Sequence, residues 1–440
     1  MRRTTRHRLL PIPFCAALVG CDLNVGDKQS DSGSTGTPAE GLAPTGDPPG
    51  IAWHVGQGTD GEEHVHEGIQ TRDGGYIAIG QTGESGGRRG TDMLVIKVDA
   101  DGELEWRTII GSARSFEVGI AILEVEDGYW AAGGLESDGT QQSAIVKLDA
   151  DGNEVWRRSY HEDGSAALRG LDHAGDGRVI ATGYRSGTED GFVFVSEESV
   201  GVLLLLDDAG NAIWDVDLEV PQGTKVRTMD DGGYAVLSTA WTFAGGEDVQ
   251  NAALVRTDAD GGVLWSQTYG GADNNQAFDF DLDPSGGFVV AGHTTGFGAV
   301  NWDCLMLRID ADGELLWHKR FGQPRGYDAR YLHDECYGIR VDERGGYVMV
   351  GGTGDEYDHS EDGHPAGASD EWKSYAVRVE PDGTLDWAQV YGDGAGEGHN
   401  AAEFLSLTAD GGYLLFNDTD SAGDAEPNNF GFMKLEVPGR

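Results

Sequence analysis

The sequence predicts an all-β protein, built as a ring of seven four-stranded units, and two observations support this prediction. Glycine occupies 70 of the 440 positions and hydrophobic residues make up 38% of the chain, which suits short strands joined by tight turns better than long helices. Three sequence markers also recur in a fixed order, each of them seven times. Their period of about 50 to 70 residues is typical of architectures in which each unit stacks on its neighbours.

The three markers divide each unit into strands. The first marker is a tryptophan in one strand of every unit: Trp53, Trp106, Trp156, Trp214, Trp265, Trp317 and Trp387. The second is a glycine turn that runs into an apolar strand, as at Gly75-Tyr76, and the third is an apolar strand that ends in an acid, as at Asp99. Asp-Gly and Gly-Gly pairs separate these stretches, as hairpins require. Each unit therefore supports four strands, which in the first full unit are HVHEGIQT, GYIAIGQT, DMLVIKVD and ELEWRTII.

The two ends of the folded region predict how the ring closes. The region begins with a tryptophan strand, IAWHVG, and ends with an acid-ended strand, FGFMKLEV. The last blade would take three strands from the C-terminus and one from the N-terminus, which hides both sheet edges. We therefore expect residues 51–440 to form a seven-bladed β-propeller of four-stranded blades, with the N-terminal strand joining the C-terminal blade. Truncation at either end should then unfold the whole ring.

The order of the markers resembles two groups of propeller repeats. Kelch repeats have the same strand order and the same closure by one N-terminal and three C-terminal strands. The phrase KLDADGNEVW resembles the quinoprotein-type repeats. In that group the tryptophan docks between neighbouring blades. The chain is most similar to a poorly characterised repeat of secreted bacterial and archaeal proteins, and the best copy here runs from Trp265 to Trp317. The resemblance covers about residues 51–440 and implies a fold but no activity, because propellers host many unrelated functions.

The N-terminal segment predicts export and a lipid anchor. A basic start is followed by LLPIPFCAALVG, which is too short to span a bilayer as a helix. The phrase LVGC, which ends at Cys21, resembles a bacterial lipobox, and this implies that Cys21 is acylated and becomes the new N-terminus. The alternative is an ordinary secretory signal with a chance cysteine. We expect residues 1–20 to be the signal peptide and the polar residues 21–50 to be a disordered tether. The protein would then sit at the cell envelope, on the periplasmic face or the cell surface.

The strong negative charge limits the classes of partner. The formal net charge is −45, whereas recognition of polyphosphates needs clustered Lys and Arg. Nucleic acid is therefore excluded as a partner, and contact with the membrane is expected through the lipid only. A solvated acidic surface is the simplest explanation of the charge.

The phrase Asp-Ala-Asp-Gly, which occurs in four units, has two interpretations. At Asp99 and Asp101 it lies where two adjacent strands need a tight connection, where Asp can cap turn amides and Gly tolerates a positive φ. A calcium loop of the EF-hand kind needs about twelve residues that end in a bidentate Glu, and here a strand resumes directly after the Gly. The sequence favours a hairpin turn over calcium ligation by Asp99 and Asp101. A calcium site shared between blades is the remaining alternative, and no cofactor is otherwise assigned.

The long and variable loops are expected to lie on one rim of the ring, and they include residues 185–200, 321–336 and 354–373. Binding groups concentrate on such loops when a rigid frame holds them. The polar groups of this rim include His64, His66, His333 and His399. Histidine and carboxylates together can bind a divalent cation, and the alternative is an acidic rim without a metal.

The cysteines and the missing catalytic motifs complete the prediction. Cys304 and Cys336 lie at the starts of strands in adjacent units, and an oxidising exterior permits a disulfide between them.

The sequence contains no G-x-S-x-G elbow, H-E-x-x-H helix or phosphate loop. It therefore favours a non-enzymatic binding or scaffolding lipoprotein whose partner is an envelope protein or a glycan. The alternative is a secreted propeller enzyme acting on carbohydrate, with two carboxylates or a metal at its mouth.

Overall fold

The computed structural model describes residues 44–83, 90–111, 115–161, 164–187, 198–244, 247–355, 371–392, 398–420 and 428–437. They belong to one compact unit, Gly36–Arg440, and form strands β1 to β28. Within these ranges, no helix is long and apolar enough to cross a membrane. The predicted signal peptide, the lipidation residue Cys21 and most of the predicted tether lie outside the described residues.

The first five sheets have four strands each, hydrogen-bonded in chain order and antiparallel. The strands are β2 (Glu62–Gln70), β3 (Tyr76–Gly83), β4 (Asp92–Val98) and β5 (Leu104–Ile110); β6 (Val118–Val125), β7 (Gly128–Ser137), β8 (Thr140–Leu148) and β9 (Glu154–Ser159); β10 (Ser165–His173), β11 (Val179–Gly187), β12 (Val200–Leu206) and β13 (Ala212–Asp217); β14 (Lys225–Thr228), β15 (Tyr234–Ala244), β16 (Glu247–Thr257) and β17 (Val263–Tyr269); β18 (Asn275–Leu282), β19 (Phe288–Thr294), β20 (Asp303–Ile309) and β21 (Leu315–Phe321).

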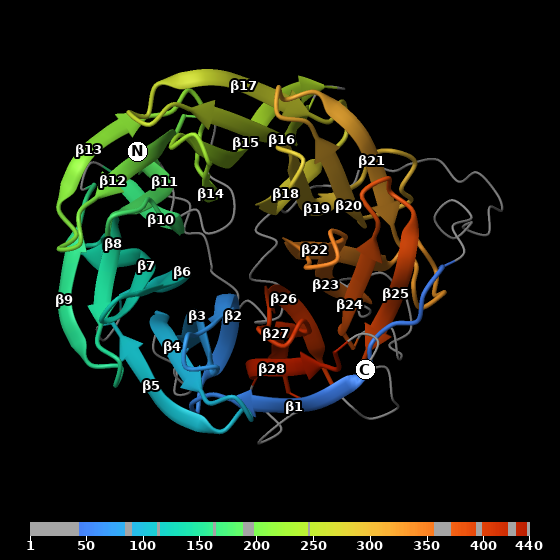
Figure 1. Ribbon diagram of the computed structural model, residues 1–440, viewed down its shortest axis with the longest axis horizontal. Coiled ribbons are helices and arrows are strands. Elements are labelled where there is room, and N and C mark those ends of the chain that lie inside the picture. The colour runs from blue at the N-terminus through green and yellow to red at the C-terminus, as the bar shows by residue number, and fades with distance from the viewer. Residues whose placement is uncertain are drawn as a thin grey trace, which may run out of the picture. The chain divides into compact units, whose positions relative to one another are not determined.

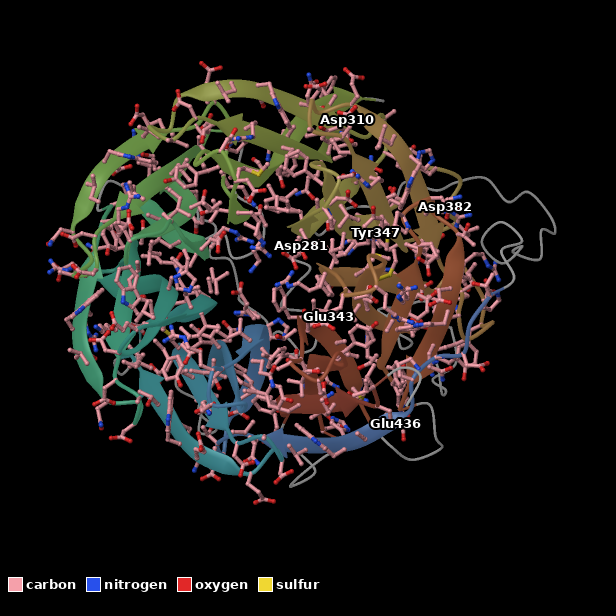
Figure 2. The ribbon with its side chains drawn as sticks, in the orientation of Figure 1. Asp281, Asp310, Glu343, Tyr347, Asp382 and Glu436 are labelled. Atoms are coloured by element: carbon pink, nitrogen blue, oxygen red, sulfur yellow. A yellow bond between two sulfur atoms is a disulfide. The ribbon has the colours of Figure 1, made fainter. Side chains whose placement is uncertain are left out.

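The sheets of this unit are arranged around a centre, as blades of a β-propeller. Figure 1 shows the first strand of each four-stranded sheet nearest the centre and the fourth strand outermost. In Figure 2, Asp281 of the inner strand β18 lies near the centre, whereas Asp310, from the turn between β20 and β21, lies toward the outside. Because consecutive strands are antiparallel, the turns between the first and second strands and between the third and fourth strands lie on one rim. The connections between the second and third strands, and those to the next sheet, lie on the other rim, which we call the loop rim.

The prediction of seven four-stranded blades is wrong, because the structure has five such blades and one sheet of eight strands. The eight-stranded sheet contains β22 (Leu332–Val341), β23 (Tyr347–Asp355), β24 (Lys373–Val379), β25 (Leu385–Tyr391), β26 (Asn400–Leu407), β27 (Tyr413–Thr419), β28 (Asn429–Leu435) and β1 (Ile51–Gln57). A parallel pairing of Lys373 with Asn400 joins its two halves. There the Asn400 amide donates to the Trp372 carbonyl at 2.8 Å. The sequence repeat predicts strands, but it does not show this pairing between strands of successive units.

The predicted pairing of the first strand with the last is confirmed. β1 pairs with β28 in antiparallel register, from Ile51 opposite Leu435 to Gln57 opposite Phe430. The residues just before β1, which the sequence assigns to the tether, also contact this sheet: Tyr391 donates its hydroxyl to the carbonyl of Pro49 at 2.9 Å. Residues 44–50 therefore pack against the folded body.

The repeated tryptophans join neighbouring sheets. Trp106 of β5 lies over Gly152 in the turn between β8 and β9, where an added Cβ would stand 2.5 Å from the indole. The indole nitrogen donates to the Ala150 carbonyl at 3.0 Å, and the ring meets Tyr129 with centroids 5.9 Å apart. Gly152 also has a φ of 79°, so both its backbone and the lack of space require glycine. The equivalent contact with a turn glycine is made by Trp53, Trp156, Trp214, Trp265 and Trp317.

A buried cation in the third strand links the parts of most blades. Lys97 lies opposite Trp106 in the β4–β5 pairing, and its ammonium contacts Asp73 at 3.1 Å and Glu105 at 2.8 Å. Asp73 belongs to the turn between β2 and β3, so the ion pair ties the third strand to the first hairpin. Equivalent pairs are Lys147–Asp127, Arg256–Asp231, Arg308–Asp283, Arg378–Asp342 and Lys434–Asp410. The β10–β13 sheet has Leu205 at this position.

Candidate functional site

Bulges in the innermost strands position the side chains at the centre of the ring. Each bulge adds one residue relative to the second strand, and such residues are re-aimed away from the ladder. The added residues are His66, Ile120, Arg169, Phe278, Tyr337 and Glu403. At Gly80, opposite the first bulge, a Cβ would stand 2.0 Å from the His64 carbonyl oxygen. The glycine in the second strand therefore makes room for the bulged backbone, and Asn417 replaces it in β27.

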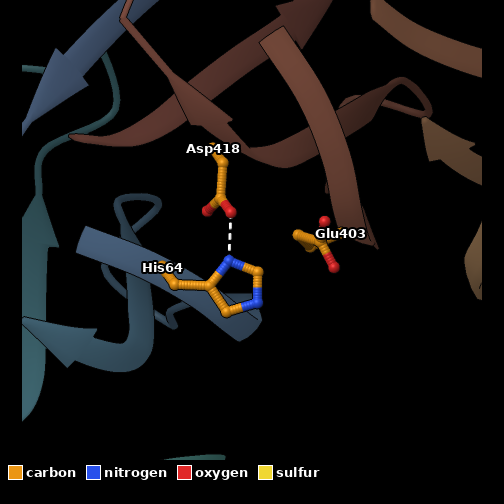
Figure 3. Close-up of side chains that lie close together, drawn as sticks. All are labelled: His64, Glu403 and Asp418. Atoms are coloured by element: carbon orange, nitrogen blue, oxygen red, sulfur yellow. Dashed lines mark hydrogen bonds and ion pairs between the residues drawn. The ribbon is translucent and has the colours of Figure 1, made fainter. Parts of the chain in front are cut away.

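One cluster of possible metal ligands lies at this centre on the side of the loop rim. His64 of β2, Glu403 of β26 and Asp418 of β27 each offer a donor atom, and these atoms all lie within 4.8 Å of one another. Figure 3 shows the three side chains facing one another from the three strands. One Asp418 oxygen accepts a hydrogen bond from the His64 ring nitrogen Nδ1, and the other accepts from the Val65 amide at 2.8 Å. Asp418 therefore fixes both the strand β2 and its histidine.

Burial, and to a lesser extent neighbouring acids, disfavours a negative charge on the carboxyl groups in and near this cluster. Glu403 is 7% exposed, and its burial, together with the charges of Asp418 and Glu335, raises its pKa well above the ordinary value. Farther toward the β18–β21 sheet, burial and the charge of Asp303 raise the pKa of Asp334 to about 7, against hydrogen bonds that lower it. A cation between the carboxyl groups of Glu403 and Asp418 would favour their charged forms.

The structure places the predicted metal-ligand histidines in three different environments. The ring of His66 meets that of His64 with centroids 4.7 Å apart, and its Nδ1 donates to the Gly119 carbonyl at 2.6 Å. Burial and the charges of His64, Arg169 and Lys225 hold the pKa of His66 well below the ordinary value, although the bond to Gly119 raises it. The imidazole of His66 is therefore neutral at pH 7.

His333 and His399 lie outside the cluster of His64. His333 contacts Glu335 at 3.0 Å, and Tyr337 donates its hydroxyl to the same carboxylate at 2.5 Å. Burial would raise the pKa of Glu335, but these two hydrogen bonds and the nearby histidines hold it below the ordinary value. The Nδ1 atom of His399 accepts from the Trp372 amide at 3.2 Å. The structure therefore assembles His64 with two acids that the sequence analysis did not select.

Asp99 and Asp101 lie on the opposite rim, in the turn between β4 and β5. One Asp99 carboxylate oxygen accepts from the amides of Asp101 and Glu103, both at 2.9 Å. The Gly102 amide donates to the Asp99 carbonyl at 3.2 Å, and Gly102 has a φ of 85°. Asp99 therefore caps a hairpin turn with its carboxylate, which is the geometry that the turn interpretation requires.

Ion pairs and the aromatic ring of Phe404 connect the innermost strands across the centre of the propeller. Glu67 of β2 pairs with Lys225 of β14 from the other side of the ring. Asp279 accepts from Arg340 at 2.5 Å and from Arg227 at 3.3 Å. Lys225 and Arg340 both lie over the ring of Phe404, at 5.0 Å and 4.6 Å from its centroid. These side chains link β2, β14, β18, β22 and β26 and brace the inner strands against one another.

Two neighbouring loops of the loop rim expose aromatic and apolar side chains. Phe297 is 40% exposed, Val300 57% and Tyr327 39%. Arg325 lies over the ring of Tyr327 at 4.9 Å. Asn301 donates its side-chain amide to the Arg330 carbonyl at 3.2 Å, which places the 295–302 and 322–331 loops against each other. We refer to Phe297, Val300, Tyr327 and Arg330 as the rim surface.

A disulfide joins the two strands into which the loops of the rim surface lead. Cys304 of β20 and Cys336 of β22 are bonded, with their Cα atoms 5.1 Å apart and a sequence separation of 32. The bond connects the β18–β21 sheet with the eight-stranded sheet. A loop of this length corresponds to a stabilisation of about 4 kcal/mol if the disulfide acts through the entropy of the unfolded chain.

A serine, a histidine and an aspartate form a row that resembles a catalytic triad. Ser143 contacts His161 Nδ1 at 2.9 Å, and His161 Nε2 donates to Asp215 at 3.0 Å. A nucleophile must reach its substrate, but Ser143 is 0% exposed in the body of β8. The row therefore connects neighbouring sheets and offers no accessible nucleophile.

The comparison with solved structures identifies the fold. The WD40 β-propeller domain of Doa1 is 10% identical over 89% of this chain and 98% of that chain, with a TM-score of 0.50. The WD40 domain of Pan2 from Neurospora crassa is 11% identical over 86% of this chain and 90% of that chain, with a TM-score of 0.51. A quinohemoprotein alcohol dehydrogenase from Pseudomonas putida is 9% identical over 91% of this chain and 78% of that chain, with a TM-score of 0.44. No protein-family model and no curated protein matches the sequence. At such identities, the likeness shows the β-propeller fold alone.

Proposed function

We propose that this chain is a binding module that holds a protein partner on the rim surface and is attached to the cell envelope by a lipid on Cys21. The observation that supports the binding of a protein is the group of exposed aromatic and apolar side chains on two adjacent loops. Aromatic residues and arginine are enriched at protein interfaces, where they supply most of the binding free energy. Such a group stands out on a chain with a formal net charge of −45.

The backbone of the rim surface supports the same proposal. Phe297 has a φ of 52°, and Gln323 in the adjacent loop has a φ of 59°. A bulky residue in the left-handed region is strained, and such strain tends to occur at binding and catalytic sites. The Cys304–Cys336 bond stiffens the strands that carry these loops. A stiff surface loses less conformational entropy when a partner binds.

The charge of the chain indicates the kind of protein partner. The acidic field attracts a partner whose surface is basic, and it speeds their encounter. Arg330 makes a bidentate contact with Asp328, at 3.0 Å and 2.6 Å. Asp328 therefore offsets the positive charge that Arg330 brings to the rim surface. The proposed partner is therefore a protein with basic surroundings and an apolar anchor that packs beside Phe297 and Tyr327.

The rim surface can be tested by photocrosslinking in intact cells. A photoreactive amino acid at Tyr327 should capture one discrete protein, whereas the same group at Leu264, which is 59% exposed on the outer strand β17, should capture none. Phe297→Gly should reduce the captured protein at least tenfold, because it removes an aromatic anchor. Glycine adopts a positive φ without strain, so the backbone of the loop tolerates this change. Equal capture at both positions would contradict the proposed surface, and capture of a glycan would contradict the choice of a protein partner.

The lipid anchor can be tested by fractionation. Cys21→Ser should move the exported chain from the membrane fraction to the soluble fraction, because the acyl chains provide the proposed attachment. Cys15→Ser, in the predicted signal peptide, is the matched control and should leave the chain in the membrane fraction. A Cys21→Ser chain that stays with the membrane would show that attachment does not depend on this lipid.

A metal-dependent enzyme acting on carbohydrate is the second candidate function. The observation that favours it is the His64, Glu403 and Asp418 cluster, because the enzyme alternative requires two carboxylates or a metal at the mouth. If substitution of these residues left every detected activity unchanged, the enzyme candidate would be wrong.

A further inference from the structure

We propose that His64, Glu403 and Asp418 bind one first-row divalent cation, such as Zn²⁺ or Mn²⁺, across the boundary between the β2–β5 sheet and the eight-stranded sheet. This inference goes beyond the proposed binding function, because none of its residues belongs to the rim surface. It rests on the geometry of the three side chains and on the environment of Glu403.

The three donors come from strands that the fold holds in place. His64 lies on β2, whereas Glu403 and Asp418 lie on β26 and β27. The bulge at Glu403 turns this residue out of the ladder, and Asp418 is held by the Val65 amide at 2.8 Å. The donor atoms already lie within 4.8 Å of one another, so the fold brings all three to the same place.

Glu403 provides the second, independent observation. Its side chain is 7% exposed, it faces the other two ligands (Figure 3), and no described residue forms a hydrogen bond or ion pair with its carboxyl group. Buried carboxylates are normally paired or bound to a metal. Among the described residues, the carboxyl group of Glu403 therefore has no counterion. A cation at this place would provide that counterion.

The donor set indicates the class of metal. Calcium prefers six to eight oxygen ligands, whereas an imidazole combined with carboxylates suits first-row divalent metals. Three protein ligands leave at least one coordination position open for water or for an oxygen of a ligand. His64 and Asp418 are partly exposed, so an ion could enter the site from the loop rim.

The decisive experiment is a calorimetric titration of the full chain, first stripped with EDTA, with ZnSO₄ and separately with MnCl₂ and CaCl₂. We expect one saturable site for Zn²⁺ or Mn²⁺ and at least tenfold weaker binding in both Glu403→Gln and Asp418→Asn. Asp334→Asn changes another buried acid near the same rim and should leave the affinity unchanged. Binding that is absent, or that persists in both cluster variants, would overturn the proposal. A site that takes only calcium would overturn the assigned class of metal.

Thermal unfolding separates loss of metal from loss of fold. An ion that binds only the native state raises the unfolding midpoint, so Zn²⁺ should raise the midpoint of the parent protein but not that of Glu403→Gln. In EDTA the Glu403→Gln chain should be at least as stable as the parent, because the substitution removes a buried acid that has no counterion. Equal Zn²⁺-induced shifts in the two chains would contradict the proposed site.

Discussion

Deletion of β1, residues 51–57, is expected to abolish cooperative folding of the whole propeller. β1 pairs along its length with β28, and Trp53 packs on Tyr76 of the β2–β5 sheet, with centroids 5.9 Å apart. Each lost backbone hydrogen bond costs about 1 kcal/mol, and the loss of the packing of the partly buried Trp53 adds to this. The total is of the same order as the whole stability of a typical domain, about 5–15 kcal/mol.

The deletion would also expose the edge of β28, whose residues are all buried in the closed ring. An unpaired apolar strand edge invites association between chains. We therefore expect the truncated chain to elute as oligomers in size-exclusion chromatography and to show no sharp unfolding transition by circular dichroism. Deletion of residues 22–43, within the predicted tether, is the control and should change neither property. A monomeric β1-deleted chain that unfolds cooperatively would show that the ring does not need this closure.

The repeat markers predicted the all-β propeller, although not its division into sheets, because the tryptophan of one marker and the tyrosine of another take part in the same contact. Trp106, the glycine of the next turn and Tyr129 meet between two sheets, so their spacing records the packing of the sheets. The acid at Asp99 caps a turn through backbone amides, which is local chemistry and therefore visible in a short stretch of sequence. The pairing of β1 with β28 was predictable for the same reason, because the markers assign each end of the chain a place in a four-stranded unit.

The features that the sequence did not reveal depend on contacts between distant segments. The eight-stranded sheet arises from one pairing, Lys373 with Asn400, and no residue type is specific for it. Glu403 and Asp418 were missed because their relation to His64 spans more than 300 residues. One signal was available: the glycine five residues into the second strand of most units, such as Gly80, lies opposite the bulge that aims a side chain at the centre. In the unit of Glu403 this glycine is replaced by Asn417, so the signal was missing at the position that mattered.

Substitution of Arg378 with Met is expected to destabilise the protein by about 3–5 kcal/mol, which is the usual cost of removing one partner from a buried ion pair. Arg378 is buried and contacts Asp342 at 2.7 Å, Glu380 at 2.6 Å and Asp386 at 2.7 Å. The side chain of Met fills a similar volume but leaves the carboxylates without their buried cation. Urea unfolding at pH 7 would measure this loss.

The pH dependence of that loss distinguishes an ion pair from simple packing. Burial alone would raise the pKa of Asp342, but hydrogen bonds from Arg378 and Tyr413 hold it below the ordinary value. A carboxyl group with a lowered pKa contributes stability above its unfolded pKa of about 3.9, and this contribution disappears as the pH falls through the folded value. The difference between Arg378→Met and the parent should therefore be largest at pH 7 and shrink as the pH falls below about 3.9 and through the lowered pKa that Asp342 has in the folded parent.

The matched control is Arg157→Met, which removes an exposed pair with Glu154 at 2.6 Å. Exposed pairs contribute less than about 1 kcal/mol because water and salt screen them. If the two substitutions had similar effects, or if the effect of Arg378→Met did not change with pH, the buried cation would act through packing alone. The repeated Lys or Arg opposite the tryptophan would then be explained by the size and shape of its side chain. A large, pH-dependent loss at Arg378 alone would show instead that each of these cations stabilises its blade by neutralising the acid of the first hairpin turn.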